Sequence, residues 1–374
     1  MFISRRDVLA ASAGACLLTL PAQAATRRLR PPFAVPRASG VAPKAKHLPK
    51  TEPVRELANE SRYRKDDPSR STVDPELSEA YERSVAPLRA FSQSVIRAAN
   101  RYVASDGKNL KAAAEAGGIL ATWAGADSLK VVSGETAQFS RLLTLGAASL
   151  GLMQIEGALK PTLRTIIANW LEDRAGETYR HYAALKTKSA ANNHRYWAGL
   201  SVLSAGIVAN RRDLFDWGVS SARIGIAEVT AEGALPLELA RGQRALSYHA
   251  YALAPLVLIA EAAARNGDSS LYDENSGALH RLIDFCLTQL DDPTRITQLA
   301  GTAQEALPNG EFYDSGDVAW LEIYESRFPG RSAWSARLPK MRPMRSTNLG
   351  GDITLLFARP GTAPANIPRG RARP

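Results

Sequence analysis

The chain has 374 residues, 45% of them hydrophobic and 22% charged, so it can bury a large core and is too apolar to be disordered throughout. The formal net charge of +10 belongs to the ends: residues 25–50 hold seven Lys or Arg and no acid, and residues 327–374 hold ten Lys or Arg and one acid. The part between them is net acidic and shows no basic face with interleaved aromatic residues, which argues against nucleic-acid binding.

Residues 1–24 have the three parts of an export signal. Arg5 and Arg6 supply the charged start, residues 8–20 form the apolar stretch, and residues 22–24 read Ala-Gln-Ala, a cleavage site. The context of the arginine pair resembles a twin-arginine signal, with Sec export as the alternative. The apolar stretch is too short for a lasting anchor, and no other segment suggests a membrane span. We therefore predict a periplasmic protein that is free of the membrane after cleavage.

Residues 25–75 are rich in Pro, Arg, Lys and Ser and lack periodicity, which predicts an extended arm followed by a loop. From Pro75 onward, apolar residues recur at helical spacing, and start signals such as Asp74-Pro75 and Pro161 precede several of the runs. Helices are predicted over residues 76–104, 108–128, 135–157, 161–174, 176–187, 193–209, 212–230, 236–265, 268–290 and 316–327. A short strand is predicted over residues 352–357, and residues 358–374 form a basic tail that we expect to be disordered.

Helices of roughly 12–30 residues joined by short links predict an all-α domain of stacked helical hairpins over residues 76–357. A bundle, a solenoid and an α/α toroid all fit this description. No repeat at a fixed period is present, which weighs against the solenoid, and periodicity does not choose between the other two.

Two stretches concentrate residues of the kinds that active sites use. Residues 189–199 bring two Asn, a His, an Arg and two aromatic side chains to a point where a loop becomes a helix. In residues 237–251, Arg241 and Tyr248 are seven apart, which places both on one face of a continuous helix. The small Ala245 between them would leave a shallow groove with a cation at one end and a phenol at the other.

These residues also have structural interpretations. A Tyr at helical spacing usually packs in a core, a lone Arg is usually solvated, and Asn-Asn before a helix is often only a cap. A glycoside hydrolase would need two facing carboxylates, and nothing in the sequence pairs the available Glu238 and Asp216. The five His residues form no cluster with metal-ligand spacing, so no metal and no other cofactor is predicted.

Motifs follow one another along most of the chain, among them Asn-Asn-His-Arg-Tyr-Trp-Ala-Gly at residues 192–199 and Leu-Phe-Asp-Trp-Gly at residues 214–218. Further motifs lie at residues 61–63, 122–127, 235–238, 241–256, 317–328 and 349–352. In residues, order and spacing they resemble the alginate lyases of polysaccharide lyase family 5. The resemblance implies an α/α toroid, an incomplete barrel with its cleft at one end.

The resemblance also implies a role for each matching catalytic position. Asn193 and His194 would bind and neutralise the carboxylate of a uronate. Arg241 would hold the same carboxylate or polarise the phenol of Tyr248. Tyr248 would take the C5 proton and pass a proton to the leaving C4 oxygen, with His194 as the rival base. An adjacent guanidinium favours phenolate, so we expect Arg241 to lower the pKa of Tyr248.

A second group of residues is expected to bind the sugar chain. Arg62 and Tyr63 match the family's lid region and would close over an anionic polymer, although a solvated basic loop is an equal alternative. Trp123, Gln138 and Arg141 lie on helices expected to face the cleft, where Trp stacks on a sugar ring and Arg pairs with a carboxylate; core packing is the alternative for Trp123. The last member, Tyr251, stands on the stripe next to Tyr248, and Ser247 occupies a position where relatives often carry His.

The predicted function is therefore that of a monomeric lyase which cleaves alginate, poly-mannuronate in preference, by β-elimination and leaves a C4=C5 unsaturated uronate. Its predicted partner is an anionic polysaccharide. Two alternatives stay open: a lyase of the same mechanism acting on another polyuronate such as glucuronan, and a non-catalytic periplasmic protein that binds a polyuronate.

Overall fold

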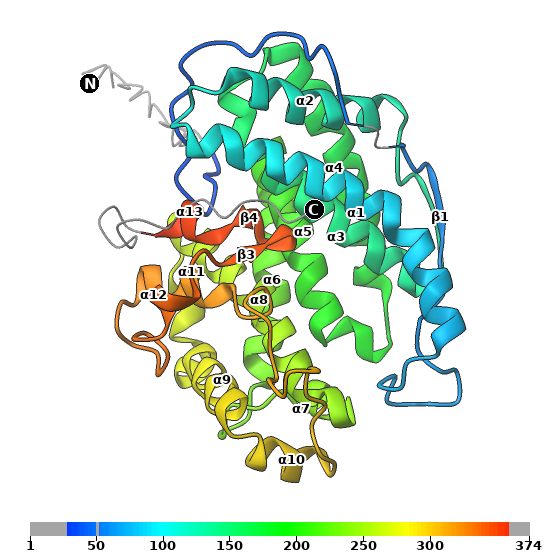
Figure 1. Ribbon diagram of the computed structural model, residues 1–374, viewed down its shortest axis with the longest axis vertical. Coiled ribbons are helices and arrows are strands. Elements are labelled where there is room, and N and C mark those ends of the chain that lie inside the picture. The colour runs from blue at the N-terminus through cyan, green and yellow to red at the C-terminus, as the bar shows by residue number, and fades with distance from the viewer. Residues whose placement is uncertain (1–27, 50–51, 359–374) are drawn as a thin grey trace, which may run out of the picture.

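The computed structural model describes residues 28–49 and 52–358 (Figure 1). The predicted export signal, and the predicted basic tail beyond residue 358, lie outside the described residues. The described chain is mainly helical, with four short strands in the described part.

The helices alternate with short loops in the order the periodicity predicts. The long ones are α1 (Pro75–Ala104), α2 (Leu110–Gly125), α3 (Glu135–Ile155), α4 (Pro161–Ala184), α5 (Asn193–Ala209), α6 (Arg212–Glu228), α8 (Ala245–Arg265) and α9 (Glu274–Asp291). The short ones are α7 (Pro236–Leu239), α10 (Thr294–Ala300), α11 (Trp320–Arg327), α12 (Leu338–Met341) and α13 (Ile353–Phe357), and 3₁₀ turns stand between several of them. The strands are β1 (Glu56–Ala58), β2 (Val131–Ser133), β3 (Arg345–Ser346) and β4 (Gly351–Asp352).

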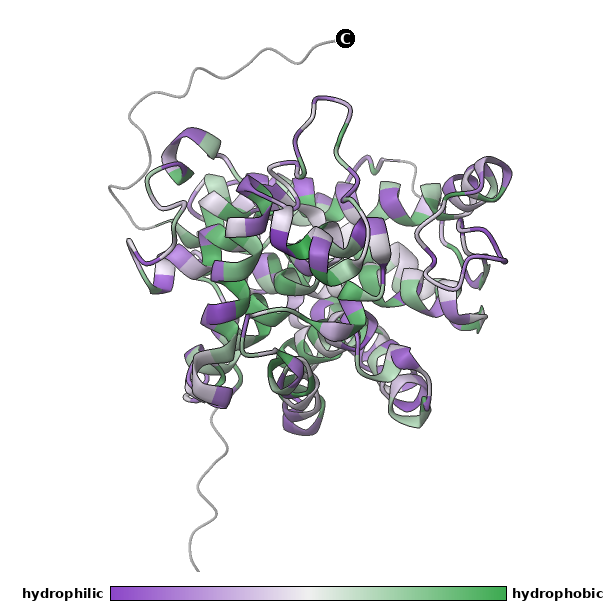
Figure 2. Ribbon diagram, turned by 90° about the horizontal axis from the view of Figure 1, so that it is seen from below, coloured by the Kyte–Doolittle hydropathy of each residue, from purple (hydrophilic) through white to green (hydrophobic). Residues whose placement is uncertain are grey.

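The long helices form an inner and an outer layer. The inner helices α1, α3, α5, α8 and α11 follow one another around the molecule, and the outer helices α2, α4, α6 and α9 cover them. Apolar residues concentrate between the layers and polar residues at the rim (Figure 2). The short elements α13 and β4 contact α1, so they bridge the two ends of the inner ring where a further hairpin would stand in a complete barrel. This is the α/α toroid that the motifs imply.

The sequence brings α5 and α6 unusually close through two glycines. A Cβ on Gly199 would lie 2.6 Å from the Cβ of Ser221, and a Cβ on Gly218 would lie 2.5 Å from the carbonyl oxygen of Gly199. Because neither position tolerates a side chain, the two motifs that contain these glycines fix the spacing of a hairpin in the middle of the ring. That hairpin begins at Asn193.

The N-terminal arm, residues 28–49, ties together one end of the toroid. Its backbone or side chains bond Asn210 after α5, Asn266 after α8, Gly107 after α1 and Ala158 after α3. These partners all follow the C-termini of inner helices. The N-termini of the same helices therefore point to the opposite end of the molecule, which is the end that carries the cavity described below.

Four predicted elements differ in the structure. The predicted helix over residues 236–265 breaks into α7, a 3₁₀ turn at Gly242–Arg244 and α8, because Gly242 takes a left-handed conformation with φ +56°. The predicted helices 161–174 and 176–187 are one helix, α4. The predicted strand at residues 352–357 is wrong beyond Asp352, whose side chain accepts a hydrogen bond from the backbone of Leu355 and starts α13 instead.

The loop predicted before α1 contains a strand that the sequence does not signal. β1 pairs in parallel with β2, which anchors the chain just ahead of the cavity. Among the described residues, the segment Gly242–Arg265 is also long and apolar enough to span a membrane, a candidate that the sequence analysis does not name; 83% of its apolar window is buried, as in a core helix.

Candidate active site

A cavity of about 710 Å³ opens between the N-termini of the inner helices and the segment before α1. Its charged lining residues are almost all cationic, namely Arg62, Arg70, Arg89, Arg241 and Arg244, against the single acid Asp317. Residues from the first turns of α3, α5 and α8 also line it, so the positive ends of these helix dipoles point at the same space. Such a cavity attracts an anionic ligand.

One wall of the cavity is built on the first turn of α5. Asn192 caps the helix by accepting a hydrogen bond from the backbone of His194, and Asn193 follows as the first helical residue. The backbone and side-chain amides of Asn193 donate to the buried carboxylate of Glu238 on α7 at 2.8 to 3.0 Å. Both Asn193 and Glu238 are fully buried. The Asn-Asn pair is thus a cap, as its structural interpretation holds, and a wall of the cavity as well.

His194 stands in this wall with its ring stacked on Phe139 of α3, at 4.2 Å between ring centroids. Its Nδ1 has no hydrogen-bond partner in the protein. Burial lowers the pKa of His194 to about 3, and the nearby Arg241 and Arg70 act in the same direction. The imidazole is therefore neutral at neutral pH.

Arg241 and Tyr248 meet in the floor of the cavity. Nη2 of Arg241 donates to the phenol of Tyr248 at 2.7 Å. The predicted contact is confirmed, but the predicted reason is not: Arg241 precedes the break at Gly242, so the two residues do not share a helix face. The left-handed glycine folds the guanidinium back over the first turn of α8.

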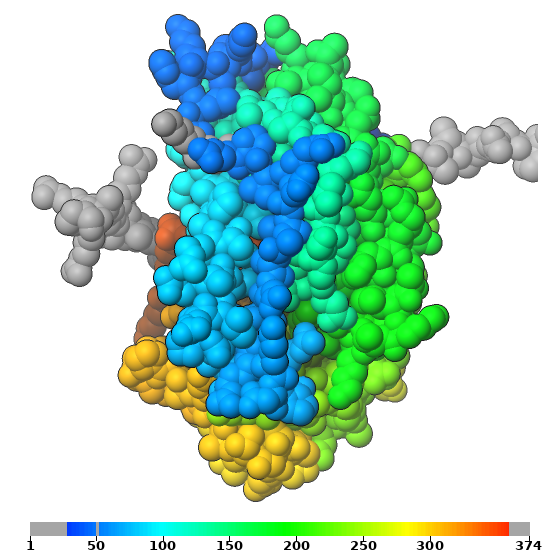
Figure 3. Space-filling view, turned by 90° about the vertical axis from the view of Figure 1, so that its right-hand side faces the viewer, coloured from blue at the N-terminus to red at the C-terminus, as the bar shows by residue number. Residues whose placement is uncertain are grey.

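The lid segment, residues 59–74, forms the opposite wall (Figure 3). It leaves β1 and runs to the start of α1, and Asp67 organises its tip by accepting hydrogen bonds from the backbones of Ser69, Ser71 and Thr72. Arg241 holds the same tip, because its Nε donates to the carbonyl of Ser69 and its Nη2 to that of Arg70. One guanidinium therefore binds the lid segment and the phenol together.

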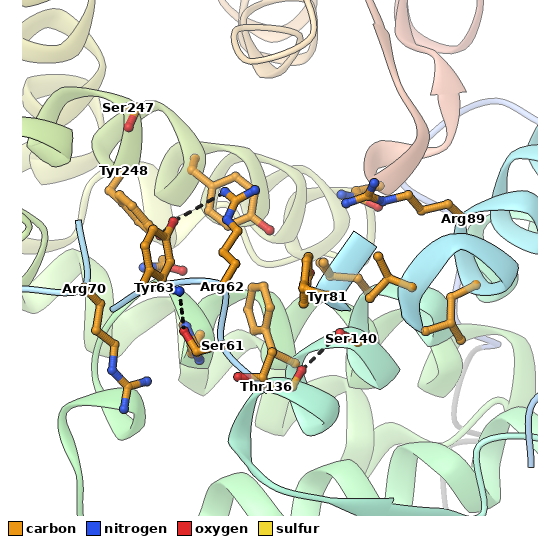
Figure 4. Close-up of a pocket in the computed structure, with 18 of the residues that line it drawn as sticks. Ser61, Arg62, Tyr63, Arg70, Tyr81, Arg89, Thr136, Ser140, Ser247 and Tyr248 are labelled. Carbon is orange, nitrogen blue, oxygen red and sulfur yellow. Dashed lines mark hydrogen bonds between the residues drawn. The ribbon is translucent and has the colours of Figure 1, made fainter. Parts of the chain in front are cut away.

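The lid segment also places Tyr63 against Tyr248, with the two hydroxyls 2.9 Å apart (Figure 4). Guanidinium groups of Arg62 and Arg244 donate to the Tyr63 hydroxyl at 3.4 and 3.3 Å. The two phenols share one hydrogen bond, and three arginines surround the pair.

The two tyrosines of this pair ionise differently. Burial raises the pKa of Tyr248 above its usual value and outweighs Arg241, so the expected lowering by the guanidinium is wrong for the unliganded site. Burial opposes ionisation of Tyr63 as well, but Arg62 and the hydrogen bond with Tyr248 outweigh it, and its pKa is lowered. The first negative charge on the pair is therefore favoured by the arginines and can be shared across the 2.9 Å contact.

Of the six residues predicted to bind sugar, the structure brings three to the cavity. Arg62, Tyr63 and Tyr251 line it. Tyr251 packs between Phe139, Trp197 and Tyr248, so it also supports the ring of Tyr248.

The other three predicted binding residues do not line the cavity. Trp123 is fully buried and stacks on Phe91 at 3.8 Å, which leaves no face for a sugar. The Arg141 side chain is 4% exposed and is held by Glu177 at 2.9 Å. Gln138 accepts a hydrogen bond from Arg141 and donates to a carbonyl of β2. Helical periodicity shows which residues share a face, but not whether that face meets the cleft or the outer layer.

Several cavity residues were not predicted from the sequence. Phe139, Arg70 and Arg89 carry no local signal, whereas Asp317 begins the motif at residues 317–328 and Arg244 lies in the same arginine-rich run as Arg241. Glu238 closes the motif at residues 235–238, but the sequence suggests a chemical role for it only as one of two possible hydrolase acids. Its proposed partner Asp216 is exposed on α6 and 3.9 Å from Arg212, so these two carboxylates do not face each other. Within the described ranges, no three His, Cys, Asp or Glu side chains gather as a metal site.

Comparisons with known proteins agree with this fold and cavity. The family model described as alginate lyase matches residues 42–296. The alginate lyase of Azotobacter chroococcum is 32% identical over 309 residues, 81% of each chain, and that of Pseudomonas syringae pv. tomato is 33% identical over 316 residues, 80% of each. A histidine-to-alanine variant of alginate lyase A1-III complexed with tetrasaccharide superposes with a TM-score of 0.71 at 25% identity, over 83% of this chain and 86% of that one.

A crystal structure of alginate lyase A1-III from Sphingomonas species A1 gives a TM-score of 0.69 at 26% identity over the same shares. The α/α toroid and its cationic cavity thus define the class, an all-α polysaccharide lyase. The chain belongs to the alginate lyase family.

Proposed function

We propose that this protein cleaves alginate by β-elimination, with poly-mannuronate preferred, and leaves a C4=C5 unsaturated uronate at the new non-reducing end. One observation carries the proposal: Arg241 donates to Tyr248 in the floor of a cavity whose wall contains Asn193 and His194. Relatives named alginate lyase, and a related enzyme complexed with a tetrasaccharide, support the choice of polymer.

The first requirement of the reaction is to neutralise the uronate carboxylate. Removing the C5 proton adds negative charge to that group, so donors aimed at it stabilise the transition state more than the ground state. Five arginines and the N-termini of the inner helices surround the space where it would lie. Asn193 and His194 are the wall residues placed to hold it.

The second requirement is a base for the C5 proton. The three arginines favour one negative charge on the Tyr63–Tyr248 pair, and that charge falls first on Tyr63, whose pKa is lowered. Tyr248 becomes the base when its proton passes to Tyr63 across the shared hydrogen bond. The phenolate takes the C5 proton, the C4=C5 double bond forms as the C4–O bond breaks, and the phenol returns the proton to the leaving C4 oxygen. Such general catalysis contributes about 10²–10⁴-fold.

A single tyrosine also supports the proposed preference for mannuronate. In mannuronate the C5 hydrogen and the C4 oxygen lie on the same face of the ring, so one phenol reaches both. In guluronate, the C5 epimer, they lie on opposite faces and a second group is needed. His194, neutral through its lowered pKa, is the group available for that role.

The test is the ultraviolet absorbance of the new double bond, followed with purified poly-mannuronate, poly-guluronate and glucuronan, with and without excess chelator. The proposal expects the fastest rise with poly-mannuronate and no effect of the chelator. A faster rise with glucuronan would assign the alternative polymer. A flat trace on all three with folded protein would reject the lyase and favour the polyuronate-binding alternative.

The proposed place of action is the periplasm, reached through the export signal in residues 1–24. Fractionation of cells that express the full chain checks this: the processed protein should appear in the periplasmic fraction. Retention of the unprocessed chain in the cytoplasm would contradict it.

A further inference from the structure

Glu238 is a buried carboxyl group to which the reaction above gives no role. It lies on α7 against the N-terminus of α5 and is 0% exposed. Its Oε1 accepts from the backbone amide of Asn193 at 2.8 Å, and both of its oxygens accept from Nδ2 of Asn193 at 3.0 and 2.9 Å. In the part of the chain that the structure describes, no Lys or Arg forms an ion pair with it.

This contact decides which end of the Asn193 amide is free. With Nδ2 turned to Glu238, Oδ1 is the end left over, and it is buried without a hydrogen-bond partner in the protein. Asn193 lines the cavity, and the end of its amide that Glu238 leaves unbonded is an acceptor beside a site built for an anion. An amide oxygen repels a carboxylate, whereas an amide NH₂ donates to it.

A proton on Glu238 reverses this arrangement. The two ends of a carboxamide are nearly the same size, so a half-turn of the Asn193 amide exchanges them without other movement. The protonated carboxyl then donates to Oδ1 and still accepts from the Asn193 backbone, while the NH₂ group turns to the cavity. Only when Glu238 is protonated can all of these hydrogen bonds form while the Asn193 NH₂ group donates to a carboxylate ligand.

Physical chemistry places this proton near neutral pH. A buried carboxylate without a paired cation is costly, and burial raises the pKa of Glu238 to about 7, against the bonds from Asn193 and the charge of Arg241. Arg241 after α7 acts on the Glu238 carboxyl, and that carboxyl in turn acts on Tyr196 of α5. His249 on α8 bonds the backbone of Leu235, just before α7. The α10 helix, which also packs on α7, contributes Arg295, whose guanidinium is held by Glu232.

We propose that Glu238 is a positioning residue whose proton sets which end of the Asn193 amide faces the uronate carboxylate. The inference rests on the proposed lyase function and adds a pH dependence to it. A bound carboxylate holds the NH₂ end and therefore the proton. One pH unit above the pKa of Glu238, KM for poly-mannuronate is therefore about tenfold higher than at acid pH, while kcat is retained.

Two variants separate the proton from the carboxyl group. Glu238→Gln supplies a carbonyl for the Asn193 backbone and an NH₂ group for its Oδ1, which fixes the amide in the productive orientation. Its KM should stay flat with pH. Glu238→Leu fills the space but holds neither end, and kcat should fall on the order of 10–10²-fold at every pH.

The experiment measures kcat and KM across the neutral and alkaline range for wild type and both variants, with circular dichroism as a check of folding. Glu322→Gln is the matched control, because Glu322 is also a buried carboxyl, 1% exposed, but binds Arg342 and Thr354 away from the cavity. Its KM should follow pH as that of wild type does. A wild type inert on every polymer would reject the proposed function itself; an active wild type whose KM profile matches that of Glu238→Gln would overturn the role of Glu238.

A binding measurement keeps the inference testable if Glu238→Gln does not fold. In a Tyr248→Phe background, which binds an oligo-mannuronate without cleaving it, calorimetry in buffers of different ionisation enthalpy counts the protons taken up. Above the pKa of Glu238 the background variant should take up close to one proton more than the same protein with Asn193→Ala, which removes the amide served by the proton. Equal uptake, attributable to groups such as His194, would overturn the inference.

Discussion

The two walls of the cavity are held in different ways. The helical wall, made by Asn193, His194, Phe139 and Glu238, stands on α3, α5 and α7, with Asn193 and Glu238 fully buried. The lid segment opposite it is charged and partly exposed, and its tip is held by hydrogen bonds from Arg241 and to Asp67. The first wall is positioned by the core, and the second by side chains at the surface.

This difference identifies the residues that both hold the cavity together and contact the phenol of Tyr248. In the helical wall, Asn193 is held by Glu238 and not by the lid segment. The lid segment, in contrast, is bound by Arg241 and carries Tyr63, and both of these residues contact Tyr248. Closing the cavity and preparing the phenol are therefore one event at these two residues, and substitutions there should disturb catalysis more than substitutions elsewhere in the lid segment.

The largest effect is expected from Arg241→Lys, which tests whether Arg241 joins the lid segment to Tyr248. A lysine keeps the charge but cannot bond both lid carbonyls and the phenol of Tyr248 at once, so kcat on poly-mannuronate should fall about 10²–10³-fold. Arg223→Lys is the control, since Arg223 pairs with two carboxylates away from the cavity. If both variants keep nearly full activity, Arg241 does not join the two walls.

The free energy of unfolding should fall in acid because of a buried histidine near the helical wall. His249 accepts from the backbone of Leu235 and is fully buried, and burial lowers its pKa to about 4. The unfolded chain takes up this proton below pH 6.5 and the folded chain does not, so stability present above that pH is lost as pH falls toward 4, by on the order of 3 kcal/mol.

Urea denaturation at a series of pH values, compared with His249→Gln, measures this share. The variant should lose less stability than wild type between pH 6.5 and 4. The comparison is necessary because Glu238, whose pKa is raised to about 7, contributes stability that is lost in the opposite direction, as pH rises. Parallel pH profiles for the two proteins would show that His249 does not remain neutral in the fold.

The Tyr63→Phe variant tests what the lid segment contributes to Tyr248. Loss of the hydroxyl removes one hydrogen bond to Tyr248, so kcat should fall about tenfold. The acidic limb of the rate profile should also move to higher pH, because the pair loses the member whose pKa the arginines lower. Tyr313→Phe, outside the cavity lining, should leave both unchanged. An unmoved limb in Tyr63→Phe would mean that the two phenols do not share a charge.

The smallest effect is expected from Asp67→Ala. Without the carboxylate, the tip of the lid segment loses its backbone hydrogen bonds and must be ordered on binding, so KM should rise a few-fold while kcat is kept. Asp66→Ala is a close control, since Asp66 bonds only the exposed Arg64. Equal KM values for the two variants would show that Asp67 does not order the lid segment.

The sequence predicts the helical frame well where local signals exist. Asp74-Pro75 starts α1, and the Asn192 cap starts α5, both at the predicted positions. Failures occur where the backbone departs from a period: Gly242 interrupts the predicted helix over residues 236–265, and Asp352 starts a helix in a run that resembles a strand. Parallel pairing of β1 with β2 joins segments too far apart in the chain for a local pattern to show.

For the site as well, the sequence predicts some residues correctly and misses others. The residues that the motifs imply as catalytic all line one cavity. Arg241 is placed there by a turn in the backbone and not by a continuous helix. Trp123 and Arg141 were expected to bind sugar, but the outer layer or the core covers them. The role of Glu238 depends on a contact between α7 and α5, and no spacing in the sequence indicates that contact.

The measurement that tests the central claim most directly compares wild type with Tyr248→Phe on poly-mannuronate, by absorbance of the double bond and by binding of an oligo-mannuronate. The account predicts that the variant binds as wild type does, has the same circular dichroism, and forms the double bond at least about 10³-fold more slowly. A variant that keeps most of the wild-type rate would show that Tyr248 is not the base.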